Sequence, residues 1–371
     1  MKRSLLALAV LGAFAGAASA QSSVTLYGIV DVGIQYDDFK RGGASSRTAV
    51  DGGFQAGNRL GVRGSEALGG NLNAIFALEA GFTIDNGLSG QQGRLFGRQA
   101  WAGVDGGIGT LVAGRIASFS SGTGAFDMFG AVDPFGTSWI TAGLQSTMSA
   151  ANAMRLDNSI MYRTPKFGGF QLGAGYSFAA NGQAPTNELG GTGNNNRVMF
   201  TGANFAAGPF YAVVTYDVIK FANAITSEDQ KMLQVGGTFD LKFLKLHGAY
   251  AKEDNVRPTT SLPAGSFVQA AAGALFGTGH DADAWMVGLS APLGAFTFMA
   301  SYQERDADAV AGGVESDGKV YAIGGKYDLS RRTNLYLVFA DTKGEKSISE
   351  SVPAADAANR KTVMLGVNHR F

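Results

Sequence analysis

Alternation of apolar and polar residues is clearest in Phe170-Gln171-Leu172-Gly173-Ala174-Gly175-Tyr176-Ser177-Phe178, where every second side chain is apolar or aromatic. Because successive side chains of a β-strand point to opposite faces, this period predicts a strand with one apolar face. The same alternation recurs at 233–239, 296–302 and 335–339. Strands of one kind are therefore predicted along most of the chain.

Breaks of two lengths separate these predicted strands. Seven short breaks lie at 67–71, 105–109, 165–169, 206–209, 240–243, 291–294 and 328–333. Eight longer polar breaks lie near 37–55, 85–92, 117–154, 180–195, 221–230, 254–282, 306–317 and 343–359. A soluble β-sandwich also alternates, but sixteen strands with short turns at one end and long loops at the other are typical of an outer-membrane barrel. We predict an all-β fold, a transmembrane 16-stranded antiparallel β-barrel with short periplasmic turns and long external loops.

Composition supports a membrane-embedded sheet. Charged residues make up 16% of the chain, glycine occurs 54 times without a Gly-X-Y period, and cysteine is absent. The composition therefore excludes a disulfide framework, a thiolate metal site and a cysteine nucleophile. No run after residue 20 is long and apolar enough for a transmembrane helix, so a membrane-embedded chain must form a closed sheet.

The first twenty residues have the pattern of a secretory signal peptide. Lys2 and Arg3 precede an apolar stretch from Leu5 to Ala18, and Ala18-Ser19-Ala20 has the small residues of a cleavage site. A transmembrane helix is the alternative, but the apolar stretch is short for one. We expect residues 1–20 to be removed, leaving the barrel domain 21–371. That domain carries 28 basic and 30 acidic residues, a balance that gives no support to nucleic-acid binding.

The last predicted strand ends in an aromatic residue at the chain terminus. Val363, Leu365, Val367, His369 and Phe371 share one face. Pairing of this strand with the first one, around 24–35, closes the sheet and leaves no open edge. We expect Phe371 to serve as the membrane-assembly terminus.

Several segments resemble the general diffusion porins of β-proteobacteria. They are Ser22-Ser23-Val24-Thr25-Leu26-Tyr27-Gly28-Ile29-Val30-Asp31, Arg59-Leu60-Gly61-Val62-Arg63-Gly64-Ser65-Glu66, Arg94-Leu95-Phe96-Gly97-Arg98-Gln99-Ala100, Asn158-Ser159-Ile160-Met161-Tyr162, Phe167-Gly168-Gly169-Phe170 and Asn368-His369-Arg370-Phe371. They run in the expected order over the whole of 22–371.

The resemblance implies a multi-pass β-barrel in the outer membrane of a Gram-negative cell, assembled as a homotrimer. It implies a third external loop, here 117–154, that folds into the lumen and constricts the pore. The turn Asp133-Pro134-Phe135-Gly136 resembles the acidic-Pro-Phe-Gly turn at the tip of that loop, with Asp where Glu is common. The implied partners are outer-membrane lipids and lipopolysaccharide, the barrel assembly machinery, and small hydrophilic solutes and ions.

Charged residues that face the lumen are the candidates for selectivity, because low-dielectric walls focus the field at the narrowest ring. Strand parity points Arg59 and Arg63 inward, opposite Leu60 and Val62. It also places Arg98 on one face with Ala100 and Ala102, and Trp101 on the other as a lipid or subunit contact. Parity relative to Ile160 and Tyr162 turns Arg155 and Asp157 inward, and Arg115 is a further lumen charge.

By resemblance to porins with arginines on the barrel wall, Arg59, Arg98 and Arg155 are expected to form such a cluster. Glu79, Asp127 and Asp133 are expected to face it across the pore. The alternative is that these arginines, together with Arg63 and Arg115, are merely solvated lumen residues balanced by nearby acids.

The predicted function is passive diffusion of small hydrophilic solutes and ions through a water-filled channel with weak anion preference. A channel specific for organic anions such as carboxylates is the alternative, and a barrel hydrolase is a remote one. Neither H-E-x-x-H nor G-x-S-x-G is present, so no enzyme activity, metal or cofactor is expected. An adhesion barrel that acts through its external loops is a third class without a sequence signature here.

Overall fold

The computed structural model describes residues 23–39, 46–136, 142–144, 147–148, 155–180, 196–220, 228–256, 280–308, 317–344 and 359–371. The expected signal peptide, 1–20, lies outside these residues, and so do parts of the loops expected at 117–154 and 254–282.

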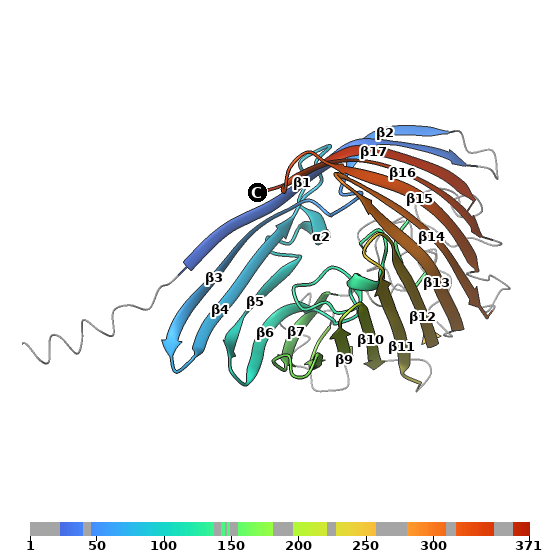
Figure 1. The fold of residues 1–371 in the computed structure, drawn as a ribbon. Helices are drawn as coiled ribbons and strands as arrows, with labels where there is room; N and C mark the ends of the chain where they lie inside the picture. The colour runs from blue at the N-terminus through green and yellow to red at the C-terminus, as the bar shows by residue number, and fades with distance from the viewer. Residues whose placement is uncertain are drawn as a thin grey trace, which may run out of the picture.

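Antiparallel strands make up most of the described chain (Figure 1). They are β1 (Ser23–Phe39), β2 (Arg47–Gly52), β3 (Arg59–Gly69), β4 (Leu72–Gly81), β5 (Gln99–Gly106), β6 (Gly109–Ala117), β7 (Arg155–Arg163), β8 (Phe170–Ser177), β9 (Arg197–Ala207), β10 (Phe210–Lys220), β11 (Gln230–Asp240), β12 (Lys245–Val256), β13 (His280–Leu293), β14 (Phe296–Ala307), β15 (Gly318–Asp328), β16 (Thr333–Gly344) and β17 (Arg360–Arg370). Two short helical segments are α2 (Gly90–Gly93) and η1 (Gly130–Val132).

The sheet closes on itself, as predicted. From β3 onward each strand pairs with the next along the chain, and β17 pairs with β1 from Ile29↔Arg370 to Phe39↔Arg360. Both β2 and β3 pair with β1, β2 with its second half and β3 with its first half. They are thus two parts of one interrupted strand, and the barrel has the sixteen strands that the sequence predicts.

The interruption between β2 and β3 turns residues 53–58 into the barrel. Gly53 has φ +77°, a left-handed conformation that glycine adopts without strain. Phe54 and Ala56 are buried there. The carboxylate of Asp31 on β1 accepts hydrogen bonds from the backbone N–H groups of Gln55 and Ala56, at 3.1 and 3.0 Å. A buried acid therefore holds this inward segment against the wall.

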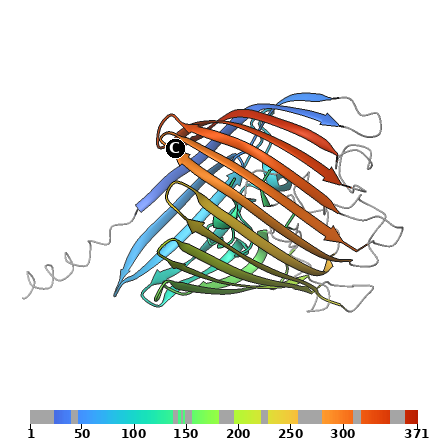
Figure 2. The ribbon, with the colours of Figure 1, turned by 45° about the vertical axis from the view of Figure 1, so that its right-hand side comes forward.

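The two ends of the barrel differ in the length of their connections. Seven tight turns, which Figure 2 shows at one end, join β3 to β4, β5 to β6, β7 to β8, β9 to β10, β11 to β12, β13 to β14 and β15 to β16. They match the seven short breaks in the sequence. Among the described residues, no helix has both the length and the hydrophobicity that crossing a membrane requires.

The outer face is apolar, as the alternation predicts. On β16, Leu335, Leu337 and Phe339 point outward and are exposed, while Tyr336 and Val338 between them are buried on the inner side. The inner side is therefore not uniformly polar. Apolar side chains also face the barrel interior wherever another segment covers them.

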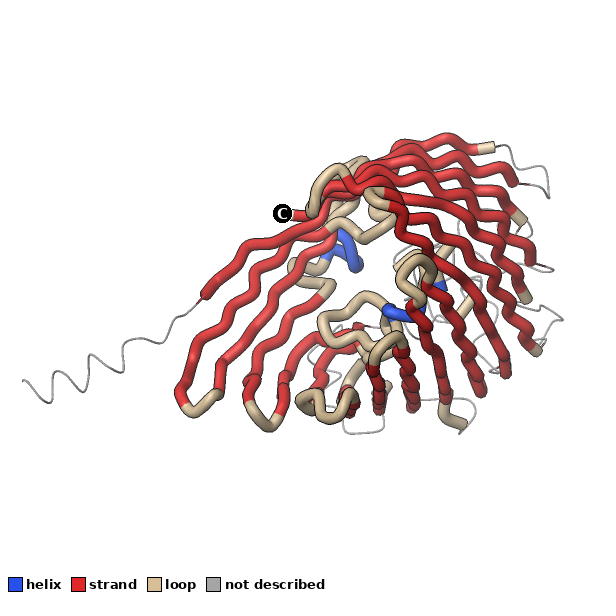
Figure 3. The backbone as a smooth tube through the Cα atoms, in the orientation of Figure 1, coloured by secondary structure: helices blue, strands red, loops and turns tan. Residues whose placement is uncertain are grey.

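The covering segment follows β6. Its described residues lie inside the ring of strands together with η1 (Figure 3). Its apolar side chains pack on inward-facing residues of the wall in two clusters, which contain Phe119, Phe126, Met128, Phe129, Val132, Phe135, Leu144 and Met148 from the segment. The hydrophobic core of this protein is thus built between the loop and the wall.

Candidate functional site

Arginine side chains gather on the inner wall where β3, β4 and β5 run side by side. The Nε of Arg98 lies 2.7 Å from Oε1 of Glu79, and Nη1 of Arg59 lies 3.9 Å from the same oxygen. Tyr27 of β1 donates its hydroxyl to Oε2 of Glu79 at 3.0 Å. One carboxylate therefore orients two guanidinium groups.

The expectation that Glu79 faces the arginines across the pore is wrong. The register pairs Gly61 of β3 with Glu79, and Glu79 with Gln99 of β5. Residues opposite each other in adjacent strands point to the same side of the sheet. Glu79 is therefore a neighbour of Arg59 and Arg98 on the same wall.

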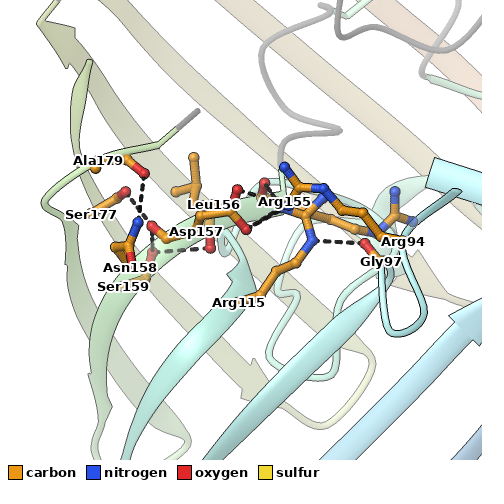
Figure 4. Close-up of polar contacts among 10 residues, drawn as sticks. All are labelled: Arg94, Gly97, Arg115, Arg155, Leu156, Asp157, Asn158, Ser159, Ser177 and Ala179. Atoms are coloured by element: carbon orange, nitrogen blue, oxygen red, sulfur yellow. Dashed lines mark hydrogen bonds and ion pairs between the residues drawn. The ribbon is translucent and has the colours of Figure 1, made fainter. Parts of the chain in front are cut away.

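A second group of arginines surrounds Asp157 (Figure 4). Nη1 of Arg94 lies 2.8 Å from both carboxylate oxygens, and Nη1 of Arg115 lies 2.6 Å from Oδ1. The Nη1 of Arg115 also donates to the backbone oxygen of Arg155 at 3.1 Å, and its Nε to the backbone oxygen of Gly97 at 2.7 Å. These contacts fix the start of β7 against the segment before β5.

A bulge places this second group. The β6–β7 register shifts between Gly114 and Ile116, and Asn158 has φ +50°. Strict alternation therefore stops at this point, because a bulge inserts an extra residue and turns the strand. Asp157 nevertheless faces inward, as parity from Ile160 predicts, and its carboxylate meets Arg94 and Arg115.

The two groups form one patch of positive charge. Arg155 interacts electrostatically with Arg98, Arg115 and Arg59, and Arg115 with Arg94. We call Arg59, Arg94, Arg98, Arg115 and Arg155 the arginine cluster. Its five guanidinium groups outnumber the two carboxylates, Glu79 and Asp157, that form ion pairs with it.

Arg98 reaches this cluster from just outside a strand. β5 begins at Gln99, so strand parity does not apply to Arg98. Trp101 faces inward, since it pairs with the buried Ala77 and its ring packs on Phe126 of the loop at 5.0 Å between ring centroids. The expected lipid or subunit contact for Trp101 is therefore wrong.

Arg63 lies apart from the cluster, four residues from Arg59 along β3 toward the short-turn end. Its guanidinium carbon lies 5.3 Å from the centre of the Tyr27 ring, and the side chain is exposed. Tyr27 thus links Arg63 to Glu79. Arg63 is a lumen charge at the approach to the arginine cluster.

The expected loop acids hold the loop in shape. Asp127 accepts hydrogen bonds from the backbone N–H groups of Gly122 at 2.7 Å, Gly130 at 2.8 Å and Phe129 at 3.2 Å. Asp133 is buried and accepts from the N–H groups of Phe135 at 2.9 Å and Leu144 at 2.8 Å. Both carboxylates therefore bind backbone donors of their own loop.

Polar contacts fix the loop to the far wall. Tyr211 of β10 donates to the backbone oxygen of Met128, and Ser120 donates to the buried Asp217 of the same strand. His247 of β12 places its Nδ1 2.9 Å from the backbone oxygen of Val132. The loop is thus tied to the wall on which it packs.

Titration of Asp127 is expected to change the charge inside the barrel near neutral pH. Burial raises the pKa of Asp127 to about 6, against the opposing effect of its three backbone hydrogen bonds. The carboxylate is therefore neutral below that pH and negative above it. Reversal potentials measured between pH 4.5 and 7.5 should shift toward cations as pH rises through about 6. The Asp127→Asn variant should lack this shift in reversal potential. An unchanged shift in the variant would show that a group other than Asp127 titrates.

The chain terminus lies against the first strand. Backbone N–H and oxygen of Phe371 pair with Gly28 at 3.1 and 3.2 Å. A Cβ at Gly28 would lie 2.4 Å from Cζ of Phe371, so the aromatic ring occupies the space that glycine leaves. The terminal residue completes the β1–β17 seam.

Two features of the interior escape sequence reasoning. Arg94 lies in the segment Arg94-Leu95-Phe96-Gly97-Arg98 but outside any predicted strand, so parity gave no reason to select it. The pair Glu253–Arg305 is fully buried, with Oε2 and Nη1 2.8 Å apart. In the sequence, Glu253 and Arg305 are each a charged residue at an inward position of a strand. A solvated lumen residue has the same pattern, so the sequence does not reveal that the two form a buried pair.

No three His, Asp or Glu side chains of the described residues converge in a way that would hold a metal ion. The ring nitrogens of His247 contact Val132 and, at 3.0 Å, the hydroxyl of Ser290. His247 thus links the loop to two strands of the wall.

Comparisons with known proteins agree with this architecture. Residues 7–347 match the family described as Gram-negative porin. An outer membrane porin protein of Bordetella pertussis is 38% identical, and outer membrane porin protein 32 of Delftia acidovorans is 31% identical, each over the full length of both chains. Among solved structures, the anion-selective porin from Comamonas acidovorans is similar, with a TM-score of 0.72, 25% identity and coverage of 95% of this chain and 100% of that one.

Proposed function

Because this chain belongs to the Gram-negative porin family, we propose that the arginine cluster gives its channel a weak preference for small anions. The protein is a multi-pass β-barrel of the outer membrane that forms a water-filled channel for small hydrophilic solutes and ions. Family and fold are those of a channel rather than an enzyme. We further propose that it has no catalytic activity of its own.

The excess of guanidinium groups over carboxylates carries the selectivity proposal. Five arginines face two acids on one wall, and a narrow passage between low-dielectric walls strengthens the resulting field. Anions are therefore attracted into the lumen and cations are repelled. The fold shared with an anion-selective porin supports the same direction.

The loop after β6 supplies the second boundary of the passage. Its apolar side chains cover the opposite wall, and Phe54 of the inward segment 53–58 belongs to the same apolar cluster as Phe135 of the loop. We propose that the loop narrows the lumen and directs solutes along the arginine cluster. Asp127 and Asp133 influence the passage indirectly, because their hydrogen bonds to backbone N–H groups fix the shape of the loop. They also contribute negative charge from inside the loop.

Reversal potentials in a planar bilayer under a salt gradient test the proposal. The wild-type channel should show an anion-selective potential, and Arg98→Glu should lower the anion-to-cation permeability ratio by roughly tenfold, because it changes the focused charge by two units. Arg331→Glu, in an exposed turn, makes the same charge change away from the cluster and should have little effect. A cation-selective wild type would overturn the proposal. Saturable block by carboxylates alone would favour the channel specific for organic anions.

Assembly and export complete the proposed function. We expect a homotrimer, seen as a detergent-resistant band that falls to the monomer mass on heating. We also propose that residues 1–20 direct export and that Phe371 is recognised by the barrel assembly machinery. N-terminal sequencing of the membrane-bound protein should begin at Gln21.

A further inference from the structure

Gly57 lies where the inward segment 53–58 meets the arginine cluster. Its backbone oxygen accepts a hydrogen bond from Nε of Arg59 at 2.9 Å. A Cβ at Gly57 would lie 2.9 Å from Nη1 of Arg98 and 3.7 Å from its Cζ. The guanidinium group of Arg98 therefore occupies the space that the side chain of any other residue at position 57 would need.

The backbone conformation does not require glycine at this position. The glycines of the described chain that have a positive φ include Gly53 but not Gly57. An alanine at position 57 therefore meets no penalty from a left-handed conformation. The obstacle to a side chain at position 57 is the close approach of Arg98.

The backbone on both sides of Gly57 is anchored to the wall. The N–H group of Ala56 donates to the carboxylate of Asp31 at 3.0 Å, and Oδ1 of Asn58 accepts from the N–H group of Asp31 at 2.6 Å. Ala56 and Asn58 are both buried. These bonds hold the segment in place, so a side chain added at position 57 has to displace the flexible end of Arg98 instead.

Arg98 is in turn held by the wall. Its Nε lies 2.7 Å from Oε1 of Glu79, and its backbone N–H group donates to the backbone oxygen of Glu79 at 3.1 Å. A Cβ at Gly81 would lie 3.1 Å from Cδ of Arg98, so glycine leaves room for the stem as well. Because the guanidinium group is planar and rigid, moving Nη1 also turns the Nε–H bond away from the carboxylate. A side chain at position 57 should therefore weaken the Arg98–Glu79 ion pair.

We propose that Gly57 is a positioning residue that sets the anion preference of the channel by leaving room for Arg98 beside Glu79. This inference rests on the proposed selectivity of the arginine cluster. A larger residue at position 57 moves the guanidinium group from its buried position into the water-filled lumen, where mobile ions screen its charge more strongly. Glu79 stays on the wall with less of its charge compensated. The segment 53–58, which has no charged side chain, thus controls selectivity.

Reversal potentials of the folded full chain in a planar bilayer under a salt gradient test this proposal. Gly57→Ala should lower the anion-to-cation permeability ratio about twofold and Gly57→Leu about threefold, because mobile ions screen a charge that has moved into water. Gly107→Ala is the matched control, since a Cβ at Gly107 meets no atom within 4 Å, and its ratio should stay at the wild-type value. An unchanged ratio in both variants of Gly57 would overturn the proposal.

Arg98→Lys separates positioning from a direct effect of bulk in the passage. Lysine keeps the positive charge but has no atom in the place of Nη1, so Gly57→Ala should not change the permeability ratio further in the Arg98→Lys background. An equal change in both backgrounds would show that residue 57 narrows the passage by itself and would overturn the proposal. A wild type without anion preference would overturn the proposed function alone, because the ratio should still respond to Gly57→Ala only when Arg98 is present.

Folding of the variants is checked on an unheated detergent gel. The folded band should persist in Gly57→Ala, because the displaced atom is the end of a flexible side chain. If the band were lost in Gly57→Ala and restored in Gly57→Ala, Arg98→Lys, the steric contact between the two positions would be supported. Loss of the band in both variants would show that glycine is needed for folding and would overturn the proposal.

Discussion

Replacing Glu253 by Gln is expected to lower the free energy of unfolding by about 3–5 kcal/mol, the usual effect of removing one partner from a buried ion pair. Glu253 of β12 and Arg305 of β14 have no exposed side-chain surface, and their closest atoms lie 2.8 Å apart. Glutamine keeps the shape but leaves the guanidinium charge buried without its counter-charge. Nη1 of Arg305 also donates to the backbone oxygen of Thr147 at 3.2 Å, so the end of the loop should loosen as well.

Urea unfolding in detergent micelles, followed by tryptophan fluorescence, measures this effect. The double variant Glu253→Gln, Arg305→Met removes both charges and should recover most of the lost stability. Asp240→Asn is the partly exposed control, since its ion pair with Lys245 spans 3.9 Å at the surface and should contribute under about 1 kcal/mol. If Glu253→Gln lowered the free energy of unfolding no more than Asp240→Asn does, the Glu253–Arg305 pair would not be the buried ion pair described here.

The Asp31→Ala substitution is expected to cost about 4 kcal/mol or more. Its fully buried carboxylate accepts from the Tyr336 hydroxyl at 2.6 Å, from Asn368 Nδ2 at 2.9 Å and from the N–H groups of Gln55 and Ala56. Alanine would leave four donors without this acceptor, and each buried unsatisfied donor costs about 1–3 kcal/mol. These donors come from β16, β17 and the inward segment 53–58, so the closing seam should weaken.

Heat modifiability on a detergent gel provides the measurement. The folded band of Asp31→Ala should be lost at a lower temperature than that of the wild type. Asp31→Asn keeps one acceptor oxygen and should fall between the two. Asp38→Ala changes an aspartate farther along the same strand, whose side chain is not fully buried, and should behave like the wild type. Equal behaviour of Asp31→Ala and Asp38→Ala would show that the seam does not depend on this carboxylate.

The sequence predicts the barrel well because its period and turns are local properties. Each tight turn and each apolar outer position follows from a few neighbouring residues, and Leu335, Leu337 and Phe339 lie outward as expected. The interruption at 53–58 was not predicted. This interruption depends on the distant acceptor Asp31 and on glycine at position 53. Neither residue alters the alternation of apolar and polar residues in the strands before and after the interruption.

The site was harder to predict because a strand boundary or a bulge displaced by one residue changes which side chains face the lumen. Parity failed at Arg98 and Trp101, since β5 begins at Gln99 and no sequence signal marks that boundary. The bulge near Asn158 likewise breaks the alternation. Glu79 was misplaced for a different reason: parity gives the face of a strand, but only register shows which side chains on that face are neighbours.

The packing of the loop on the wall bears on how such a pore is widened by engineering. Gly173 and Gly202 leave room for the ring of Phe119, and a Cβ at Gly288 would lie 2.7 Å from Cγ of Pro134. Beside them, the wall beneath the loop presents Met161, Phe200, Met286 and other apolar side chains. Deleting the loop would therefore expose to water a strip of apolar side chains, with gaps at the glycines that now accommodate the loop. The wider pore would be poorly wetted along that strip and would adsorb hydrophobic solutes there. Loop and wall must therefore be redesigned together.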